Sequence, residues 1–217
     1  AKSKYSHELS IFKEFIAESE EEYYIFKARA LSGISASESI GVLSEGIEKL
    51  HSADLHILRG VYWISYLSDH ARAISDFKAA CELDPQNHGA HYALAKAQLE
   101  SGIIKEGLSS ITIAVNLDGA NPDYHLLKAQ AQISMGDFAF ALESLDNVLA
   151  LGKISPDIYM LRILCKRKLG DLRGGIEEAE VARFVYPDNF MITALWQGMN
   201  DLKNKPSGQH LDFEAED

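Results

Sequence analysis

Hydrophobic residues recur at intervals of three and four along most of the chain, which is the spacing of one face of a helix. The first such segment spans residues 5–18, with apolar positions at Tyr5, Leu9, Phe12, Phe15 and Ile16. The same spacing returns at residues 190–203, where the apolar positions are Phe190, Ile192, Leu195, Trp196, Met199 and Leu202. The pattern predicts helices throughout, and therefore an all-α fold.

Small residues repeat along the chain with a period of 34 residues. The three series are Gly102, Gly136, Gly170, then Ala73, Gly107, Ala141, Gly175, and then Ala80, Ala114, Val148, Ala182. This period is typical of helix–turn–helix repeats that stack into a solenoid. The small residues predict a close crossing within each helix pair, because a larger side chain would hold the two backbones apart.

Residues that stop a helix mark the end of each repeat. They are Asp84-Pro85, Asp118-Gly119, Leu151-Gly152 followed by Pro156, and Tyr186-Pro187. Proline just beyond a helix cannot continue it, and glycine readily adopts the left-handed turn that closes one. The sequence therefore predicts four clear repeats, which span residues 54–87, 88–121, 122–155 and 156–189.

The turn glycines, the small residues of the second helices and the closing Asp84-Pro85 resemble those of the tetratricopeptide repeat family. The resemblance implies a right-handed α-solenoid of stacked antiparallel helix pairs, closed by a C-terminal capping helix at residues 190–203. Residues 1–53 are interpreted as an N-terminal helix and a degenerate repeat. Residues 1–203 would then form a single superhelical domain, followed by an acidic flexible tail at residues 204–217.

One repeat departs from the family pattern. Arg59-Gly60 resembles a pair that is common in the first helices of this family, but it lies one residue early relative to Ala73. The turn at residues 67–69 also lacks the usual glycine. A one-residue insertion in that turn would explain both features, so the inward face of residues 54–67 has two alternative registers, one position apart.

The formal net charge of −11 disfavours nucleic acid and anionic membranes as partners. No apolar run approaches the roughly 18 residues that suggest a membrane span. Cys81 and Cys165 lie among apolar neighbours and are interpreted as buried free thiols, which need no oxidising compartment. A cytoplasmic location is therefore favoured, while the first residue, Ala1, keeps a processed export product as the alternative.

Motifs for catalysis or cofactor binding are missing from the sequence. It contains no phosphate-binding glycine loop, no paired-cysteine metal spacing and no nucleophile elbow. His88 and His91 could bind a metal only with a third ligand, so we expect a capping or surface role for both. Glu177, Glu178 and Glu180 are expected to be solvated charges on an outward-facing helix. We therefore predict a protein that is not an enzyme and needs no cofactor or metal.

The concave groove is the remaining candidate for function. By resemblance to the family, the groove would be lined by Arg59, Tyr62, Tyr66, Tyr92, Lys96, Leu99, Leu126, Gln130, Ile133, Met160, Leu164 and Arg167. Family members that clamp a C-terminal carboxylate use asparagine at the position held here by Lys96, Gln130 and Leu164, which argues against that mode. The lining is aromatic and aliphatic with a few cations, which suits an apolar or amphipathic peptide. Packing between neighbouring first helices is the alternative role for the leucines and methionine.

We therefore predict a scaffold or adaptor that binds a peptide or helix of a partner protein in its groove. The first alternative is self-association or autoinhibition, in which the acidic tail folds onto Arg59, Lys96 and Arg167, or a neighbouring copy forms a homo-oligomer. A second alternative is a scaffold for secretion or envelope assembly that binds a polymer such as polysaccharide through its tyrosines.

Overall fold

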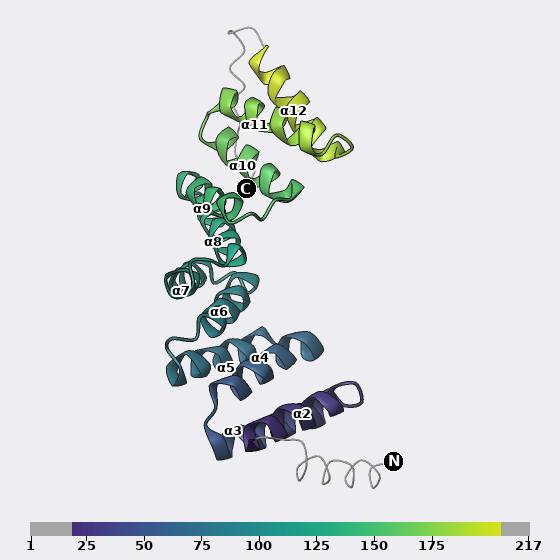
Figure 1. The fold of residues 1–217 in the computed structure, drawn as a ribbon, viewed down its shortest axis with the longest axis vertical. Helices are drawn as coiled ribbons and strands as arrows, with labels where there is room; N and C mark the ends of the chain where they lie inside the picture. The colour runs from purple at the N-terminus through teal and green to yellow at the C-terminus, as the bar shows by residue number, and fades with distance from the viewer. Residues whose placement is uncertain (1–18, 205–217) are drawn as a thin grey trace. The chain divides into compact units, whose positions relative to one another are not determined.

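The computed structural model describes residues 19–204, and every regular element in that range is an α-helix (Figure 1). The predicted helix at residues 5–18 and the tail beyond Asn204 lie outside the described residues. None of the described helices is both long and apolar enough to cross a membrane. The prediction of an all-α fold of stacked helix pairs is confirmed.

First helices and second helices alternate along the chain. The first helices are α2 (Glu20–Ser32), α4 (Ala53–Leu67), α6 (His88–Glu100), α8 (Pro122–Met135), α10 (Pro156–Lys168) and α12 (Phe190–Lys203). The second helices are α3 (Ala36–Leu50), α5 (His70–Leu83), α7 (Ile104–Leu117), α9 (Phe138–Ala150) and α11 (Leu172–Val185). Contacts group the chain into two compact units, whose boundary falls within α8 between Ala131 and Gln132.

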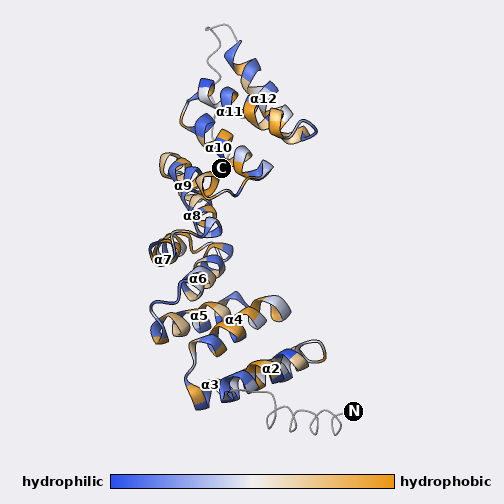
Figure 2. Cartoon of the chain, viewed as in Figure 1, coloured by the Kyte–Doolittle hydropathy of each residue, from blue (hydrophilic) through white to orange (hydrophobic). Residues whose placement is uncertain are grey.

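Within each unit, consecutive helices pack against one another. In the first unit these contacts run from α2 through α7, and in the second unit α10 packs on α9, on α11 and on α12. Each helix carries both hydrophobic and hydrophilic residues along its ribbon (Figure 2). The packing of apolar faces between neighbours produces a series of local cores, as expected where each repeat contacts only the next.

The turn glycines close three of the first helices. Gly102, Gly136 and Gly170 have φ angles of 76°, 83° and 78°, which glycine adopts without strain because it has no Cβ. After each of them, the next backbone N–H donates to the carbonyl five residues back, as Ile103 does to Gln98. The glycine ladder therefore predicted the turns correctly.

The end of α4 contains the additional residue that the sequence suggested. Ser68 takes the left-handed position with a φ of 52°, but the Asp69 N–H donates to the carbonyl of Trp63, six residues back. The body of α4 is therefore displaced by one residue relative to α6. Side chains that match between α4 and α6 lie 35 residues apart, as do the buried residues Gly60 and Ala95.

Small residues occupy the close crossings that their period predicted. Ala73, Ala114 and Ala141 are fully buried. A Cβ placed on Gly107 would lie 2.7 Å from side-chain atoms of Leu99, and one on Gly60 would lie 2.5 Å from the Phe77 ring. Both distances are too short for real contacts, so each crossing depends on the absence of a side chain.

A polar pair links the two helices of each of the four clear repeats at one equivalent place. The Ser110 hydroxyl donates to Gln98 Oε1 at 2.8 Å, and the Ser144 hydroxyl donates to Gln132 Oε1 at 2.7 Å. At the same place, Trp63 Nε1 donates to Asp76 at 3.0 Å, and Lys166 Nζ donates to Glu178 at 2.7 Å. The geometry is retained while the chemistry changes, because a buried polar atom needs a partner.

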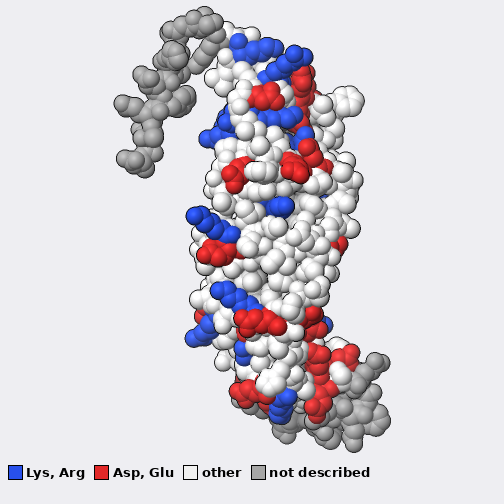
Figure 3. All heavy atoms as spheres, turned by 90° about the vertical axis from the view of Figure 1, so that its left-hand side faces the viewer, with Lys and Arg blue, Asp and Glu red and all other residues white. Residues whose placement is uncertain are grey.

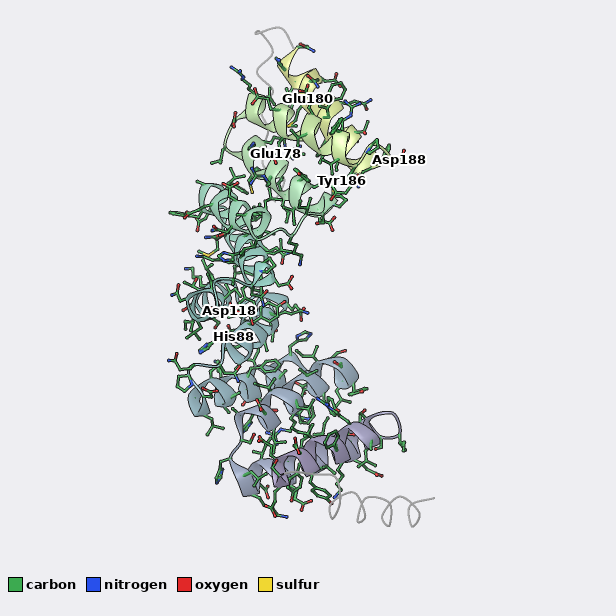
Figure 4. All side chains as sticks on the ribbon, viewed as in Figure 1. His88, Asp118, Glu178, Glu180, Tyr186 and Asp188 are labelled. Atoms are coloured by element: carbon green, nitrogen blue, oxygen red, sulfur yellow. The ribbon has the colours of Figure 1, made fainter. Side chains whose placement is uncertain are left out.

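Charged residues of both signs are interspersed on the face shown in Figure 3, and some of them pair beneath the surface. Glu178, on α11 (Figure 4), accepts hydrogen bonds from Arg162 at 2.7 Å and from Lys166 at 2.7 Å. Arg162 also pairs with Asp146 on α9. The Glu178 side chain is only 10% exposed, so the expectation of a solvated charge at this position is wrong.

Burial and pairing act in opposite directions on the pKa of Glu178. Burial disfavours the ionised carboxylate and raises its pKa, but the hydrogen bonds from Arg162 and Lys166 outweigh burial. The net effect places the pKa of Glu178 below its ordinary value. Because the folded pKa is lowered, the pair stabilises the protein above the unfolded pKa, and that stabilisation is lost as pH falls through the folded pKa.

Replacing Ala141 by leucine should lower the free energy of unfolding by about 1–3 kcal/mol, because a fully buried position has no room for the added carbons. Ala139 lies on the same helix and is exposed, so Ala139→Leu is the matched control and should change stability by under about 0.5 kcal/mol. Urea unfolding followed by circular dichroism measures both. Equal midpoints for the two variants would contradict a tight crossing at Ala141.

Replacing Glu178 by glutamine should lower the free energy of unfolding at pH 7 by roughly 1–3 kcal/mol, because the variant weakens charge-assisted hydrogen bonds in a buried place. The difference from the wild type should shrink only as pH falls through the lowered pKa of Glu178, below the ordinary range of a glutamate, where the wild-type carboxyl also becomes protonated. Glu177 is exposed and, among residues 19–204, pairs only with Arg173 four residues earlier, so Glu177→Gln should have little effect at pH 7 or at acid pH. Urea titrations at both pH values test this, and a pH-independent difference would exclude the ion pair as its source.

Candidate functional site

A pocket of about 270 Å³ lies between α4 and α6, with Phe77 of α5 at its base. Helix α4 contributes Val61, Ile64 and Ser65, and helix α6 contributes Tyr92, Ala93, Lys96, Ala97 and Glu100. The two alanines leave space on α6 that a larger residue would fill. The lining is mostly hydrocarbon, so the pocket can accept an apolar group from solution.

The base of the pocket is part of the protein core, whereas its edge is exposed to solvent. Phe77 is 2% exposed and packs with Ile74 and Leu94, which makes the base rigid. Val61 at the edge is 41% exposed. The Lys96 amine is exposed and forms no ion pair with any residue in the described range, whereas Glu100 lies 3.7 Å from His70 Nδ1.

The position of Tyr92 is determined by a stack of aromatic rings. Its ring stacks on that of Tyr124 with centroids 4.9 Å apart, and the Tyr124 hydroxyl lies 2.7 Å from His88 Nδ1. Burial of Tyr124, reinforced by the nearby charge of Asp118, raises the pKa of that phenol and keeps it protonated. The neutral Tyr124 side chain therefore positions Tyr92, which forms one side of the pocket, through ring stacking and not through an ion pair.

A second pocket, of about 390 Å³, lies in the second unit between α10 and α12. It is lined by Arg167, Met191, Ala194, Leu195, Gly198, Met199 and Leu202. Arg167 is the only charged residue in this lining. The remaining side chains are apolar, and Met199 belongs to the core that α12 forms with Ile163 and Ile176.

Three of the predicted groove residues line these two pockets. Tyr92 and Lys96 border the first pocket, and Arg167 borders the second. The other predicted residues of α6, α8 and α10 lie outside both linings, namely Leu99, Leu126, Gln130, Ile133, Met160 and Leu164. Leu99 packs over Gly107, and Met160 packs against the core formed by Tyr159, Ala182 and Ile192. Leu99 therefore packs on the second helix of its own pair, and Met160 packs on a core that includes Ile192 of α12.

The predicted residues of α4 lie elsewhere. Arg59 donates to Asp76 at 2.9 Å and 2.6 Å and to Ser44 at 2.9 Å. Its guanidinium is therefore paired inside the protein and does not face a groove. Tyr62 is 7% exposed and belongs to the core of the first unit. Tyr66 is exposed and meets the edge of the Tyr62 ring, outside the pocket.

The displacement of α4 by one residue explains these differences. With a spacing of 35 residues, Lys96 corresponds to Val61 and not to Tyr62, and Glu100 corresponds to Ser65 and not to Tyr66. Val61, Ile64 and Ser65 were therefore missed. The signal that could have found them was in the sequence, since the second of its two alternative registers places these residues on the inward face.

The two histidines considered as metal ligands have structural partners. His91 Nε2 lies 3.1 Å from the carbonyl oxygen of Pro85, and His125 Nε2 lies 3.0 Å from that of Gly119 in the next repeat. His88 is held by Tyr124. No group of three or more possible metal-ligating residues is found within residues 19–204. His91 and His125 join α6 and α8 to the loops that precede them.

Comparisons with known proteins agree with the fold. Residues 67–131 match the tetratricopeptide repeat family. No curated protein matches the sequence. The chain is therefore shown to contain tetratricopeptide repeats, as the resemblance predicted.

Several solved structures are similar to this one. A segment of MamA from Desulfovibrio magneticus has a TM-score of 0.69 at 16% identity, covering 80% of this chain and 99% of that one. YrrB, described as a tetratricopeptide repeat protein with an unusual peptide-binding site, has a TM-score of 0.65 at 17% identity, covering 74% and 83%. A tetratricopeptide repeat protein from Parabacteroides merdae has a TM-score of 0.71 at 11% identity, covering 84% and 73%. At these identities the likeness concerns the fold alone.

Adjacent substitutions in α4 should distinguish the two registers. Tyr62→Ala should lower the free energy of unfolding by about 3 kcal/mol, because it removes a buried aromatic side chain. Val61→Ala should cost under about 1 kcal/mol, because Val61 borders an open pocket. Thermal and urea unfolding measure both. A larger loss for Val61→Ala than for Tyr62→Ala would restore the register with the 34-residue spacing.

Proposed function

We propose that this chain, a tetratricopeptide repeat protein, is a non-enzymatic scaffold that binds a segment of a partner protein at the pocket between α4 and α6. The single observation that carries the proposal is the rigid apolar hollow over Phe77, edged by Tyr92 and Lys96. The peptide-binding site reported for YrrB, a protein of similar fold, supports the same class of ligand.

The size of the pocket favours a side chain of a partner over a free small molecule. Its volume of about 270 Å³ lies below the roughly 300–1,000 Å³ that is typical of small-molecule sites. A large apolar residue that inserts into a rigid pocket is the usual anchor of a protein–protein contact. We therefore propose that one leucine-sized or aromatic side chain of the partner contacts Phe77 and the alanines of α6.

The edge of the pocket suggests what flanks that anchor. Lys96 has no ion-pair partner among the described residues, so a carboxylate next to the anchor would gain a new contact there. Glu100 disfavours a second acidic group on its own side of the pocket. The preferred segment therefore has one large apolar residue and an acidic residue placed toward Lys96.

The double substitution Tyr92→Ala and Lys96→Glu should weaken partner binding by about ten- to a hundredfold, or about 1.4–3 kcal/mol. It removes one wall of the pocket and reverses the charge at its edge, while both residues are at least partly exposed, so folding should be nearly unchanged. Partners captured by the intact protein are identified by mass spectrometry, and their affinities are then measured by calorimetry.

The matched control changes Lys105→Glu and Ile113→Ala, which are exposed on α7 and outside the pocket. The control should bind every partner as the wild type does. Val61→Glu tests the opposite wall and should weaken binding to a similar degree. Wild-type affinity in a correctly folded double variant would overturn the proposal.

A further inference from the structure

The pocket between α10 and α12 has an apolar face that no described helix covers. Met191, Ala194, Gly198 and Leu202 follow at spacings of three and four along α12, so they share one face of that helix. Met191 is 57% exposed and Leu202 is 48% exposed. A Cβ built on Gly198 would meet nothing within 4 Å, so the middle of the pocket is open.

Positive charge lies at one end of this face. Arg167, in the last turn of α10, lines the pocket together with residues of α12 that include Leu202 in its last turn. Lys168 follows Arg167, and Lys203 follows Leu202. Within the described part of the chain, Arg167 has no ion-pair partner. An occupant of this pocket should therefore combine apolar side chains with negative charge.

The segment that follows α12 has this composition. Residues 205–217 place Leu211 and Phe213 in alternation with acidic residues, and they contain one lysine against four acidic residues. The segment begins after Asn204, next to the basic end of the pocket. Pro206 and Gly208 favour a turn there, which is needed for the chain to reverse direction.

We propose that residues 205–217 bind in the pocket between α10 and α12 of the same molecule, with Leu211 and Phe213 on the apolar face and their acidic neighbours near Arg167. The nine residues from Asn204 to Phe213 can span about 30 Å when extended. Helix α12 has 14 residues and is therefore about 21 Å long, so the segment can reach any part of the face.

Attachment to α12 makes this contact effective even where the intrinsic affinity is weak. A short flexible connection produces an effective concentration in the millimolar range. The bound segment would exclude any other ligand from this pocket of the second unit. The pocket between α4 and α6 is not involved, and this proposal stands or falls independently of the proposed function.

The methionines provide a direct test, because only four are present in the chain and two of them, Met191 and Met199, line the pocket. With carbon-13 labelled methionine methyl groups, the full chain is compared by NMR with a chain ending at Asn204. Truncation should shift the signals of Met191 and Met199 and leave Met135, on α8, unchanged. Single Met→Leu substitutions, which nearly conserve volume, assign each signal.

Two further measurements identify the residues responsible. Leu211→Ala with Phe213→Ala should reproduce the spectrum of the truncated chain, whereas the matched variant Gln209→Ala should retain that of the full chain. A synthetic peptide of residues 205–217 added to the truncated chain should move the two signals back in a saturable manner. Arg167→Glu in the truncated chain should weaken that titration.

The proposal is overturned if the methyl spectra of the full and truncated chains coincide. It is also overturned in its intramolecular form if the shifts depend on protein concentration and light scattering shows a doubled mass, because the segment then binds a second copy. Shifts that are independent of concentration, are lost with Leu211 and Phe213, and are restored by the peptide support it.

Discussion

The close approach of the two helices in each repeat is the constraint on which the rest of the structure depends. At Gly107 the backbone of α7 comes so near Leu99 of α6 that even a methyl group would collide. This approach brings Ser110 within hydrogen-bond distance of Gln98, and a similar approach at Gly60 seats the Phe77 ring against α4. The pocket over Phe77 therefore follows from the packing of the helix pairs.

The polar pairs between first and second helices show how one geometry accommodates different chemistry. In a neutral pair, such as Gln98 with Ser110, one hydrogen bond between the two side chains is sufficient. Asp76 and Glu178 instead place a charged carboxylate below the surface. Each of these carboxylates is accompanied by an arginine from the first helix, Arg59 or Arg162. The reason is energetic, because a buried charge without a partner would cost several kcal/mol.

Much of the fold could be predicted from the sequence, because turn glycines and small residues act locally. Gly102 and Gly136 indicate a turn in any repeat, and two of the residues that the sequence assigns to the groove, Tyr92 and Lys96, line the pocket. The α4 side of the pocket was placed wrongly, since its register depends on one backbone hydrogen bond from Asp69 to Trp63. The residues show this displacement only through the missing glycine at Ser68 and the early Arg59-Gly60 pair.

The misplacement of Arg59 and Glu178 has a different cause. Taken singly, Arg59 is typical of a groove cation and Glu178 of a solvated surface charge, and neither residue indicates its partner. Their partners lie on the other helix of the pair, 17 residues away for Arg59 and 16 for Glu178. The recurrence of an arginine and a carboxylate at equivalent places in two repeats was the only hint available.

Arg162 forms ion pairs in two neighbouring repeats, and these pairs affect how the second unit unfolds. Its guanidinium joins Asp146 on α9 to Glu178 on α11, so the ion pair crosses the boundary between neighbouring repeats. In stacked repeats, stability is a sum of internal terms and nearest-neighbour interface terms. Loss of α11 would remove Glu178 and leave Arg162 paired only with the exposed Asp146 among the described residues. The ion pairs of Arg162 therefore couple the unfolding of α10 to that of α9 and α11.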